Sequence, residues 1–381
     1  PTAYAALGGP GAGRTVLAPQ VRFTVPQGLV AGSDAPWTTL PAGARADVEQ
    51  LLRRIGLDPA TYRSVRDPVP QRRVLTQSPP RLRWTLDTAA RAGTGGETWG
   101  DTHFARSLAA ALRRLGQHVA VDPAPARHRW SRGLDDVVVV LRGLDRVQPG
   151  PAAVHLLWVI SHPDLVDAEE VAAYDGVFAA SLSWAAARTR EWGLPVEPLL
   201  QCTEPALFHP GRAEPDTGAD VLFVGNSRGV VRPALAGALA AGAHVSVHGG
   251  GWGPVLPDLD VVSRHVDNTE LGRLYAGAGV VLNDHWDDMR RDGFVSNRLF
   301  DATACAARVV SDDVAGVDLL FGSQVHTFED PDEVAGLLAG VPADFPSFDE
   351  RLALAARVAA EHSFEHRAAT LLDVAVDRLR R

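Results

Sequence analysis

The chain has 381 residues, of which 46% are hydrophobic, and its 37 cationic and 46 acidic residues give a net charge of -9. This composition is typical of a soluble globular protein, and the length predicts two domains, each able to bury its own core. All 37 cationic residues are arginine, which excludes a lysine Schiff base and a Walker-type phosphate loop, while the acidic balance argues against a nucleic-acid-binding surface.

Residues 1–80 are rich in proline, glycine and arginine, and we interpret them as an extension packed on the first domain. One amphipathic helix is predicted within them, over 44–55. Residues 1–83 carry 11 arginines against 5 acidic residues, which we interpret as a solvated basic face.

Regular alternation of strands and helices begins at Arg81 and predicts a first domain over 81–205. The predicted strands are 82–86, 118–121, 136–141, 154–160 and 176–181, and the predicted helices are 102–115 and 184–192. Continuous apolar runs such as 136–141 and 154–160 are typical of strands buried on both faces of a parallel sheet. A glycine-rich turn over 93–100 follows the first strand.

Residues 195–214 contain four prolines and are expected to link this domain to a second one over 206–347. The predicted strands of the second domain are 220–224, 244–248, 279–283 and 308–311, and its helices are 231–241, 269–276 and 297–306. The tail, 348–381, is helical by its apolar period. The fold class is therefore α/β, with two doubly wound Rossmann-like domains facing a cleft.

The segment 284–313 is the most informative one for function. A strand ends at Asn283, and the turn before the predicted helix leads into Ser296 or Asn297 as the cap of a helix start that can bind an anion. Arg298 can add a two-pronged contact to a phosphate, and Asp301, one turn later, can accept hydrogen bonds from a ribose. The alternative is an ordinary helix cap followed by an Arg–Asp surface pair.

The order of these elements, followed by an A-x-A-C-A run and a VVS strand, resembles the donor-binding motif of group 1 glycosyltransferases with the GT-B fold. The run SNRLFD is most similar to the spore-maturation-protein-like branch. The segments 156–164, 199–205, 220–228 and 361–372 fit the same family, so the resemblance spans residues 80–381. It implies a hexosyltransferase that uses a nucleotide-diphosphate sugar such as a UDP or GDP sugar, needs no cofactor or metal, and retains the anomeric configuration.

The resemblance also implies the site residues. The donor-binding candidates are Asn226, Arg228, His248, Gly249, Val266, Phe294, Val295, Ser296, Asn297, Arg298 and Asp301. The C-terminal helices, 348–381, are expected to cross back to the first domain. Two departures stand out. Gly293 occupies the place of the first of two family glutamates, so the adjacent Asp292 is the catalytic candidate for that sugar-contacting role. The family's phosphate-binding lysine is absent.

The first domain is then expected to bind the acceptor. Gly95 and Gly96 in the glycine-rich turn allow a close approach to a diphosphate or a sugar, although the turn lacks the dinucleotide-binding fingerprint. His162, which follows the strand 154–160, is the first candidate for proton transfer, with simple hydrogen bonding as its alternative. Asp101 and Asp164 are further candidate bases.

Several alternatives stay open at this stage. His285, Asp287 and Asp288 form an acid-rich loop that could hold a metal ion, and acidic residues near the sugar would also suit a nucleotide-sugar epimerase. A catalytically silent binding module of a longer chain is a third reading, because the chain begins at Pro1 and its one methionine is Met289.

The remaining features concern the setting of the protein. Cys202 and Cys305 are too few for a disulfide framework or a zinc site, and no window has the apolar length of a membrane span. We therefore expect a cytoplasmic protein with reduced thiols. The lack of lysine is typical of a bacterial high-GC genome.

Overall fold

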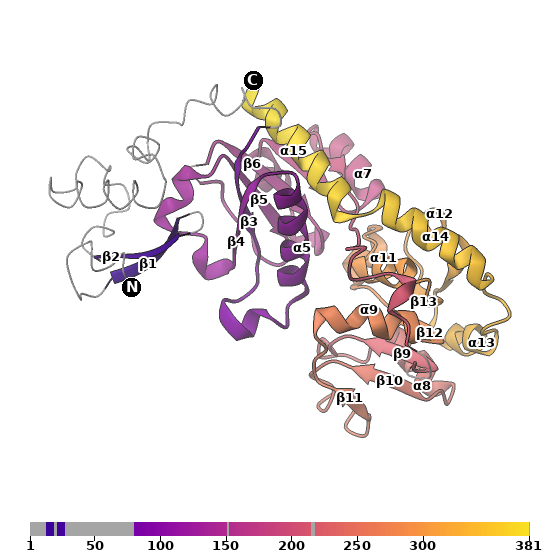
Figure 1. Ribbon diagram of the computed structural model, residues 1–381. Coiled ribbons are helices and arrows are strands. Elements are labelled where there is room, and N and C mark those ends of the chain that lie inside the picture. Colours follow the sequence, from indigo (N-terminus) through magenta and orange to yellow (C-terminus); the bar gives the residue numbers. More distant parts are fainter. Residues whose placement is uncertain (1–12, 19–20, 27–79, 151, 215–217, 381) are drawn as a thin grey trace, which may run out of the picture.

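The computed structural model describes residues 13–18, 21–26, 80–150, 152–214 and 218–380 (Figure 1). Within the N-terminal part, β1 (Gly13–Ala18) and β2 (Val21–Pro26) pair as an antiparallel hairpin. The helix predicted over 44–55 lies outside the described residues.

The first sheet has six parallel strands in the order β4-β3-β5-β6-β7-β8. They are β3 (Arg83–Asp87), β4 (His118–Asp122), β5 (Val137–Arg142), β6 (Val154–Val159), β7 (Gly176–Ala179) and β8 (Glu197–Pro198). Every residue of β5 and β6 is buried, which explains why their sequences are continuous apolar runs. The edge strand β8 falls in the segment predicted as a linker, and an edge position tolerates its proline.

Three α-helices follow strands of this sheet. They are α5 (Gly100–Arg114), α6 (Ala168–Ala172) and α7 (Leu182–Trp192). The predicted amphipathic pattern of α5 is confirmed, because Phe104, Leu108 and Leu112 belong to the buried core over the sheet. The sequence did not indicate α6, which is too short to show a helical period.

The second sheet also has six parallel strands, in the order β11-β10-β9-β12-β13-β14. They are β9 (Val221–Val224), β10 (Val245–His248), β11 (Val261–Ser263), β12 (Val280–Asn283), β13 (Val309–Asp312) and β14 (Val325–Phe328). Numbered from β9, this is the order 3-2-1-4-5-6, which reverses direction between β9 and β12. In the first sheet the order reverses between β3 and β5. Ligands of such sheets bind outside the carboxyl ends of the strands at these reversals.

The helices that accompany the second sheet are α8 (Pro233–Ala240), α9 (Asn268–Gly277), α10 (Asp287–Arg291), α11 (Asn297–Ala304), α12 (Val317–Phe321) and α13 (Val334–Ala339). The sequence did not indicate three of them. The missed ones are α10, α12 and α13, which have five or six residues each. The strands β11 and β14 were missed as well. The helix most important for function, α11, begins at the predicted residue.

The C-terminal helices connect the two domains. The first, α14 (Phe348–Glu361), packs on α11, and the second, α15 (Phe364–Arg380), packs on α5 and β6 (Figure 1). Phe364 and Leu371 are buried in the core of the first sheet. Within the described ranges, no helix combines the length and the apolar character needed to cross a membrane.

A second connection joins the domains near the cleft. Met289 and Phe294 come from the second half of the chain, yet they belong to a core cluster of the first domain with Val138 and Trp184. The Phe294 and Trp184 rings meet edge to face with centroids 5.6 Å apart. The predicted α/β class with two doubly wound domains is confirmed.

Candidate active site

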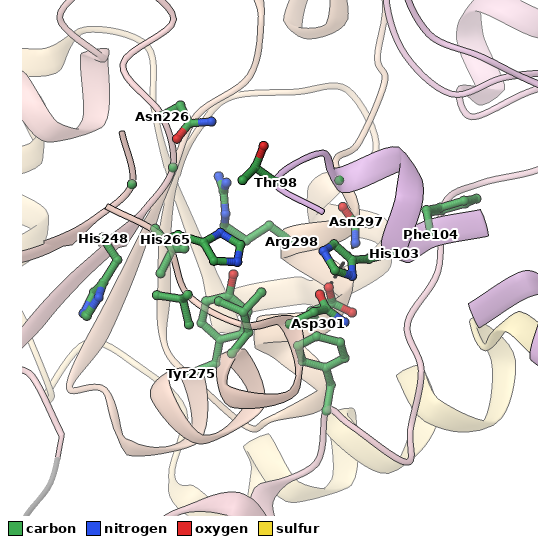
Figure 2. Close-up of a pocket in the computed structure, with 18 of the residues that line it drawn as sticks. Thr98, His103, Phe104, Asn226, His248, His265, Tyr275, Asn297, Arg298 and Asp301 are labelled. Carbon is green, nitrogen blue, oxygen red and sulfur yellow. Dashed lines mark hydrogen bonds between the residues drawn. The ribbon is translucent and has the colours of Figure 1, made fainter. Parts of the chain in front are cut away.

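Two adjoining cavities lie at the carboxyl ends of both sheets, with volumes of about 240 and 460 Å³. They share residues from both domains, namely Thr98, Gly100, Phe104, Gly225, Asn226, Asn297 and Arg298, and therefore form one cleft. Figure 2 shows Thr98 and His103 of the first domain beside Arg298 and Asp301 of the second, around the smaller cavity.

Most of the predicted donor-binding residues line this cleft. The smaller cavity is lined by Asn226, His248, Gly249, Val266, Asn297, Arg298 and Asp301, and the larger one by Asn226, Arg228, Ser296, Asn297 and Arg298. Phe294 and Val295 line neither cavity. Their side chains are fully buried in two hydrophobic cores and hold the turn before α11 against them.

A cluster of arginines forms the positive end of the larger cavity. Burial, together with the charge of Arg298, lowers the pKa of Arg228 to about 10, and burial also lowers the pKa of Arg232. The Arg228 guanidinium lies 4.2 Å from the centre of the Trp286 ring, which holds it in place. Mutually repelling guanidinium groups in a cavity are stabilised by a bound anion.

Arg232, which the sequence analysis missed, differs from the other two arginines. It forms a buried ion pair with Asp284, and its Nη1 donates to the Asn226 carbonyl at 3.0 Å. It therefore ties the loop after β9 to the end of β12. The sequence signal that could have identified Arg232 is its position four residues after Arg228, in the segment that follows β9.

The sequence predicted that the N–H groups at the start of α11 are unpaired and that a side chain caps the helix. The structure differs on both points. The Ser296 N–H donates to Nε2 of His285 at 3.0 Å, and the Asn297 N–H donates to Oε1 of Gln201 at 2.9 Å. The Ser296 side chain makes no capping bond. An anion at this helix start therefore has to displace these partners or bind mainly through Arg298.

A network of polar side chains fixes this helix start, and sequence analysis did not identify it. His285 Nδ1 lies 2.6 Å from Oδ1 of Asp312, while Asn283 accepts from Arg298 Nη1 at 2.9 Å. Burial raises the pKa of Asp312, but its interactions with His285, which include hydrogen bonds from the His285 ring and backbone N–H, outweigh burial, so the pKa lies below its usual value. Because these residues end the neighbouring strands β12 and β13, they meet at one sheet edge.

In the acid-rich loop that was considered as a metal site, His285 and Asp288 have other partners. His285 is used by Asp312 and Ser296, and Asp288 faces His162. Among the residues described, no three His, Cys, Asp or Glu side chains gather as metal ligands would.

Asp301 lies at the end of the smaller cavity, one turn into α11. Its carboxylate accepts from Thr203 Oγ1 at 2.7 Å and from Asn297 Nδ2 at 3.0 Å. Burial raises the pKa of Asp301 to about 8. Thr203, 98 residues earlier in the chain, gave no sequence signal.

His248 and Gly249 lie at the other end of the smaller cavity. The His248 ring hydrogen-bonds Ser263 Oγ at 2.8 Å, and burial lowers its pKa, so it is neutral at pH 7. Gly249 has a φ of 141°, and a Cβ there would lie 2.1 Å from the Gly225 carbonyl oxygen. This position requires glycine, which brings the loops after β9 and β10 together.

The two glycines predicted to approach the donor, Gly95 and Gly96, do not line the cleft. Gly95 lines neither cavity, and Gly96 lines a separate one with Arg91 and Arg106. A Cβ on Gly96 would lie 2.1 Å from the Arg91 carbonyl oxygen, so its role is a tight backbone turn. Asp101, in the first turn of α5, does line the larger cavity, and burial raises its pKa to about 6.

His162 lies at the junction of the domains and lines neither cavity. Its Nδ1 is 3.5 Å from Oδ2 of Asp288, and its ring centre is 5.4 Å from that of Trp286. Burial lowers its pKa. The residue has a φ of 53°, which is strained for a residue other than glycine.

Asp164 and Asp292 also lie at the junction, where both pair with Arg291. The Asp292 carbonyl accepts from Ser181 Oγ at 2.6 Å. Gly293 has a φ of 72°, and a Cβ there would lie 2.6 Å from Ser183 Oγ. An acidic side chain at 293, as the family pattern has it, would be strained at this φ and would require the Ser183 hydroxyl to move.

Part of the sequence, and the fold as a whole, are similar to known proteins. Residues 228–373 match a family model described as glycosyl transferase-like. The structure is similar to that of AviGT4, a glycosyltransferase involved in avilamycin A biosynthesis, at 18% identity and a TM-score of 0.51, covering 78% of this chain and 98% of that one.

A second similar structure is the sucrose-phosphate synthase of Thermosynechococcus elongatus, at 15% identity and a TM-score of 0.54, covering 77% of this chain and 98% of that one. The search of curated proteins found no match. The predicted GT-B fold is confirmed, and residues 228–373 are similar to the glycosyl transferase-like family, while the spore-maturation-like branch stays a prediction.

Proposed function

We propose that this protein transfers a hexose from a nucleotide-diphosphate donor, such as a UDP or GDP sugar, to a glycan, protein or small-molecule hydroxyl. Residues 81–205 would form the acceptor domain, 206–347 the donor domain, and 348–381 the helices that join them. The observation that carries the proposal is the arginine cluster in a cavity that continues into the end lined by Asp301. Positive charge at one end and a carboxylate at the other match a diphosphate and a ribose.

The arrangement also explains how the protein would promote transfer. Negative charge grows on the diphosphate as its bond to the sugar breaks. The guanidinium groups of Arg228 and Arg298 are already held by Trp286 and Asn283, so they can stabilise that charge without rearranging. We propose that these arginines replace a metal ion and that no cofactor takes part.

Two stereochemical courses are proposed. Retention of the anomeric configuration follows from the sequence resemblance. Inversion is favoured by Asp101, a carboxylate on the acceptor side of the larger cavity whose pKa burial raises to about 6. A base on the acceptor side suits direct displacement by a hydroxyl. The epimerase alternative is disfavoured, because Asp287 and Asp292 line neither cavity.

The test has a binding part and a turnover part. Calorimetry with UDP, GDP and inorganic pyrophosphate should show binding of at least one nucleotide more tightly than pyrophosphate, and no binding would contradict the donor site. Thermal shift with UDP and GDP sugars then identifies the donor, since a selective ligand stabilises the folded state. Binding without transfer or hydrolysis would favour the silent binding module.

A further inference from the structure

Trp99 stands at the end of the glycine-rich turn of the first domain, and it lines the larger cavity. It occupies the N-cap position of α5, where its backbone is held on both sides. Its N–H donates to the Gly96 carbonyl at 3.1 Å, and its own carbonyl accepts from the Thr102 N–H at 3.1 Å. The backbone of Trp99 is therefore fixed, while its indole is partly exposed.

The Trp99 side chain contributes little to the fold. In the part of the chain that the structure describes, it belongs to none of the hydrophobic core clusters and has no ring, cation–π or hydrogen-bond partner. It makes no capping hydrogen bond either, although this position favours Ser, Thr, Asp or Asn. Neither packing nor capping explains a large aromatic side chain here, and a ligand does.

The other tryptophans differ from Trp99. Trp286 lines the same cavity from the second domain, but its ring lies 4.2 Å from the Arg228 guanidinium and 5.4 Å from the centre of the His162 ring. The remaining tryptophans with described side chains have a hydrogen-bond acceptor or another ring as partner, namely Trp84, Trp158, Trp184, Trp192 and Trp252. Among described side chains, Trp99 is thus the tryptophan that is left for a ligand.

Two polar groups of the first domain line the same cavity and are also open. Asp101 lies in the first turn of α5, and Ser161 follows β6. A Cβ built on Gly143 would lie 3.3 Å from Oδ2 of Asp101 and 3.4 Å from Oγ of Ser161, so the two oxygens are close neighbours. No other described residue hydrogen-bonds either group. The first-domain face of the cavity therefore presents an aromatic ring, a carboxylate and a hydroxyl.

This combination suits a sugar ring better than a flat aromatic alcohol. The face of a pyranose that carries C–H bonds packs on an aromatic ring, while the hydroxyls around its edge donate to a carboxylate and accept from a hydroxyl. Burial raises the pKa of Asp101 to about 6, so the carboxylate is ionised at pH 7.5 and needs donors. A flat aromatic alcohol also stacks on an indole, but it brings only one hydroxyl.

We propose that Trp99 is the platform on which a pyranose ring of the acceptor stacks, with Asp101 and Ser161 hydrogen-bonding its hydroxyl groups. The inference rests on the proposed function, and it narrows the acceptor to a glycoside. Because Arg228 and Arg298 line the same cavity from the second domain, a ring on Trp99 faces the proposed diphosphate site.

The experiment measures binding and then transfer, on the whole chain. Saturation-transfer NMR, with the nucleoside diphosphate that binds in calorimetry, compares the methyl glycosides of glucose, galactose, mannose and N-acetylglucosamine with 4-methylphenol. Transfer to the best glycoside from the nucleotide sugar is then followed by product NMR. The variants are Trp99→Ala, Trp99→Phe and Trp99→Ser. Trp192→Ala is the matched control, because it removes a partly exposed indole of the same domain outside both cavities.

We expect at least one methyl glycoside to bind and to be an acceptor. Trp99→Ala should lower its affinity about 10-fold, the size of one lost aromatic stack, and Trp99→Phe should keep most of it. Trp99→Ser supplies a favoured N-cap, so it should weaken glycoside binding as alanine does without lowering the melting temperature. The affinity for the nucleoside diphosphate should not change, and Trp192→Ala should bind the glycoside normally.

Other outcomes contradict different claims. The platform would be overturned by glycoside binding that is absent or equal in the unmodified protein and Trp99→Ala, and by tighter binding of 4-methylphenol than of any glycoside. Affinity that falls only where the melting temperature also falls would assign Trp99 a structural role instead. Glycoside binding without transfer would contradict its place as the acceptor. A chain that binds neither a nucleoside diphosphate nor a nucleotide sugar would overturn the proposed function.

Discussion

The two faces of the cleft are built differently. On the second-domain face, the polar groups at the strand ends already have protein partners, as in the pairs His285–Asp312 and Arg232–Asp284. On the first-domain face, no other described residue hydrogen-bonds the Asp101 carboxylate or the Ser161 hydroxyl, both of which line the larger cavity.

This difference suits the two faces to different ligands, the diphosphate on the second-domain face and the acceptor on the first-domain face. A face whose groups are mutually paired holds one ligand chemistry in one geometry, which suits an invariant diphosphate. Open groups on the other face of the same cavity suit a hydroxyl whose carrier is bound elsewhere. Substitutions on the donor face should therefore change affinity for the diphosphate, and those on the acceptor face should change turnover.

The strongest test of the donor face is Arg298→Ala. Arg298 lines both cavities, and its guanidinium is fixed by Asn283. We expect a loss of about 100-fold in affinity for UDP or GDP, because a charge-assisted hydrogen bond contributes about 1.5–3 kcal/mol. Calorimetry measures it, and Arg190→Ala, at an exposed position on α7, is the control. Equal losses in both variants would contradict a local phosphate site.

The next test concerns His285, which lines the larger cavity and positions the start of α11 through Ser296. His285→Ala leaves the buried Ser296 N–H without its acceptor, so the start of α11, which carries Arg298, should shift to find another partner. We expect this displacement of Arg298 to weaken diphosphate binding about 10-fold, the size of one lost buried hydrogen bond. His285→Gln can restore that acceptor and should recover most of the affinity. A purely structural role would instead lower the melting temperature of both variants without separating their affinities.

The sequence predicted the architecture better than the site. Strands such as β5 and β6 were predictable because burial on both faces requires continuous apolar residues. Arg298 and Asp301 were found through local spacing on one helix. The Ser296 N–H bond to His285 and the Thr203 bond to Asp301 were not predictable, because each joins residues that only the tertiary fold brings together.

Asp292 and His162 are residues that the local sequence suggested but that lie outside the two cavities. Both were named as catalytic candidates on local sequence, since each stands in a loop that follows or precedes a regular element. The structure places their side chains at the domain junction, beside Arg291 and Asp288. A side chain's direction in such a loop depends on backbone φ, as at His162, and sequence patterns do not report it.

A smaller effect is expected from pH, through Asp301. Its pKa of about 8 means that the carboxyl is largely protonated at pH 7, whereas accepting hydrogen bonds from both ribose hydroxyls requires the ionised form. Nucleotide affinity should therefore rise with pH, about 10-fold between pH 7 and 9, with proton release at pH 7. Asp301→Asn removes this ionisation while the ligand stays the same, so it should release fewer protons with the nucleotide than the unmodified protein does. Equal proton release by the two proteins would exclude Asp301 as its source.

The smallest effect separates catalysis from domain contact at His162. The His162 Nδ1 faces Asp288 across the junction, and its side chain lines neither cavity. His162→Ala should therefore leave diphosphate affinity unchanged and slow turnover only about 3-fold, by loosening a partly exposed pair. Asp288→Asn removes the same contact from the other domain and should have the same effect, without additivity in the double variant. A loss of 100-fold or more in His162→Ala alone would make His162 the base, and the acceptor face would then be organised around His162 in place of Asp101.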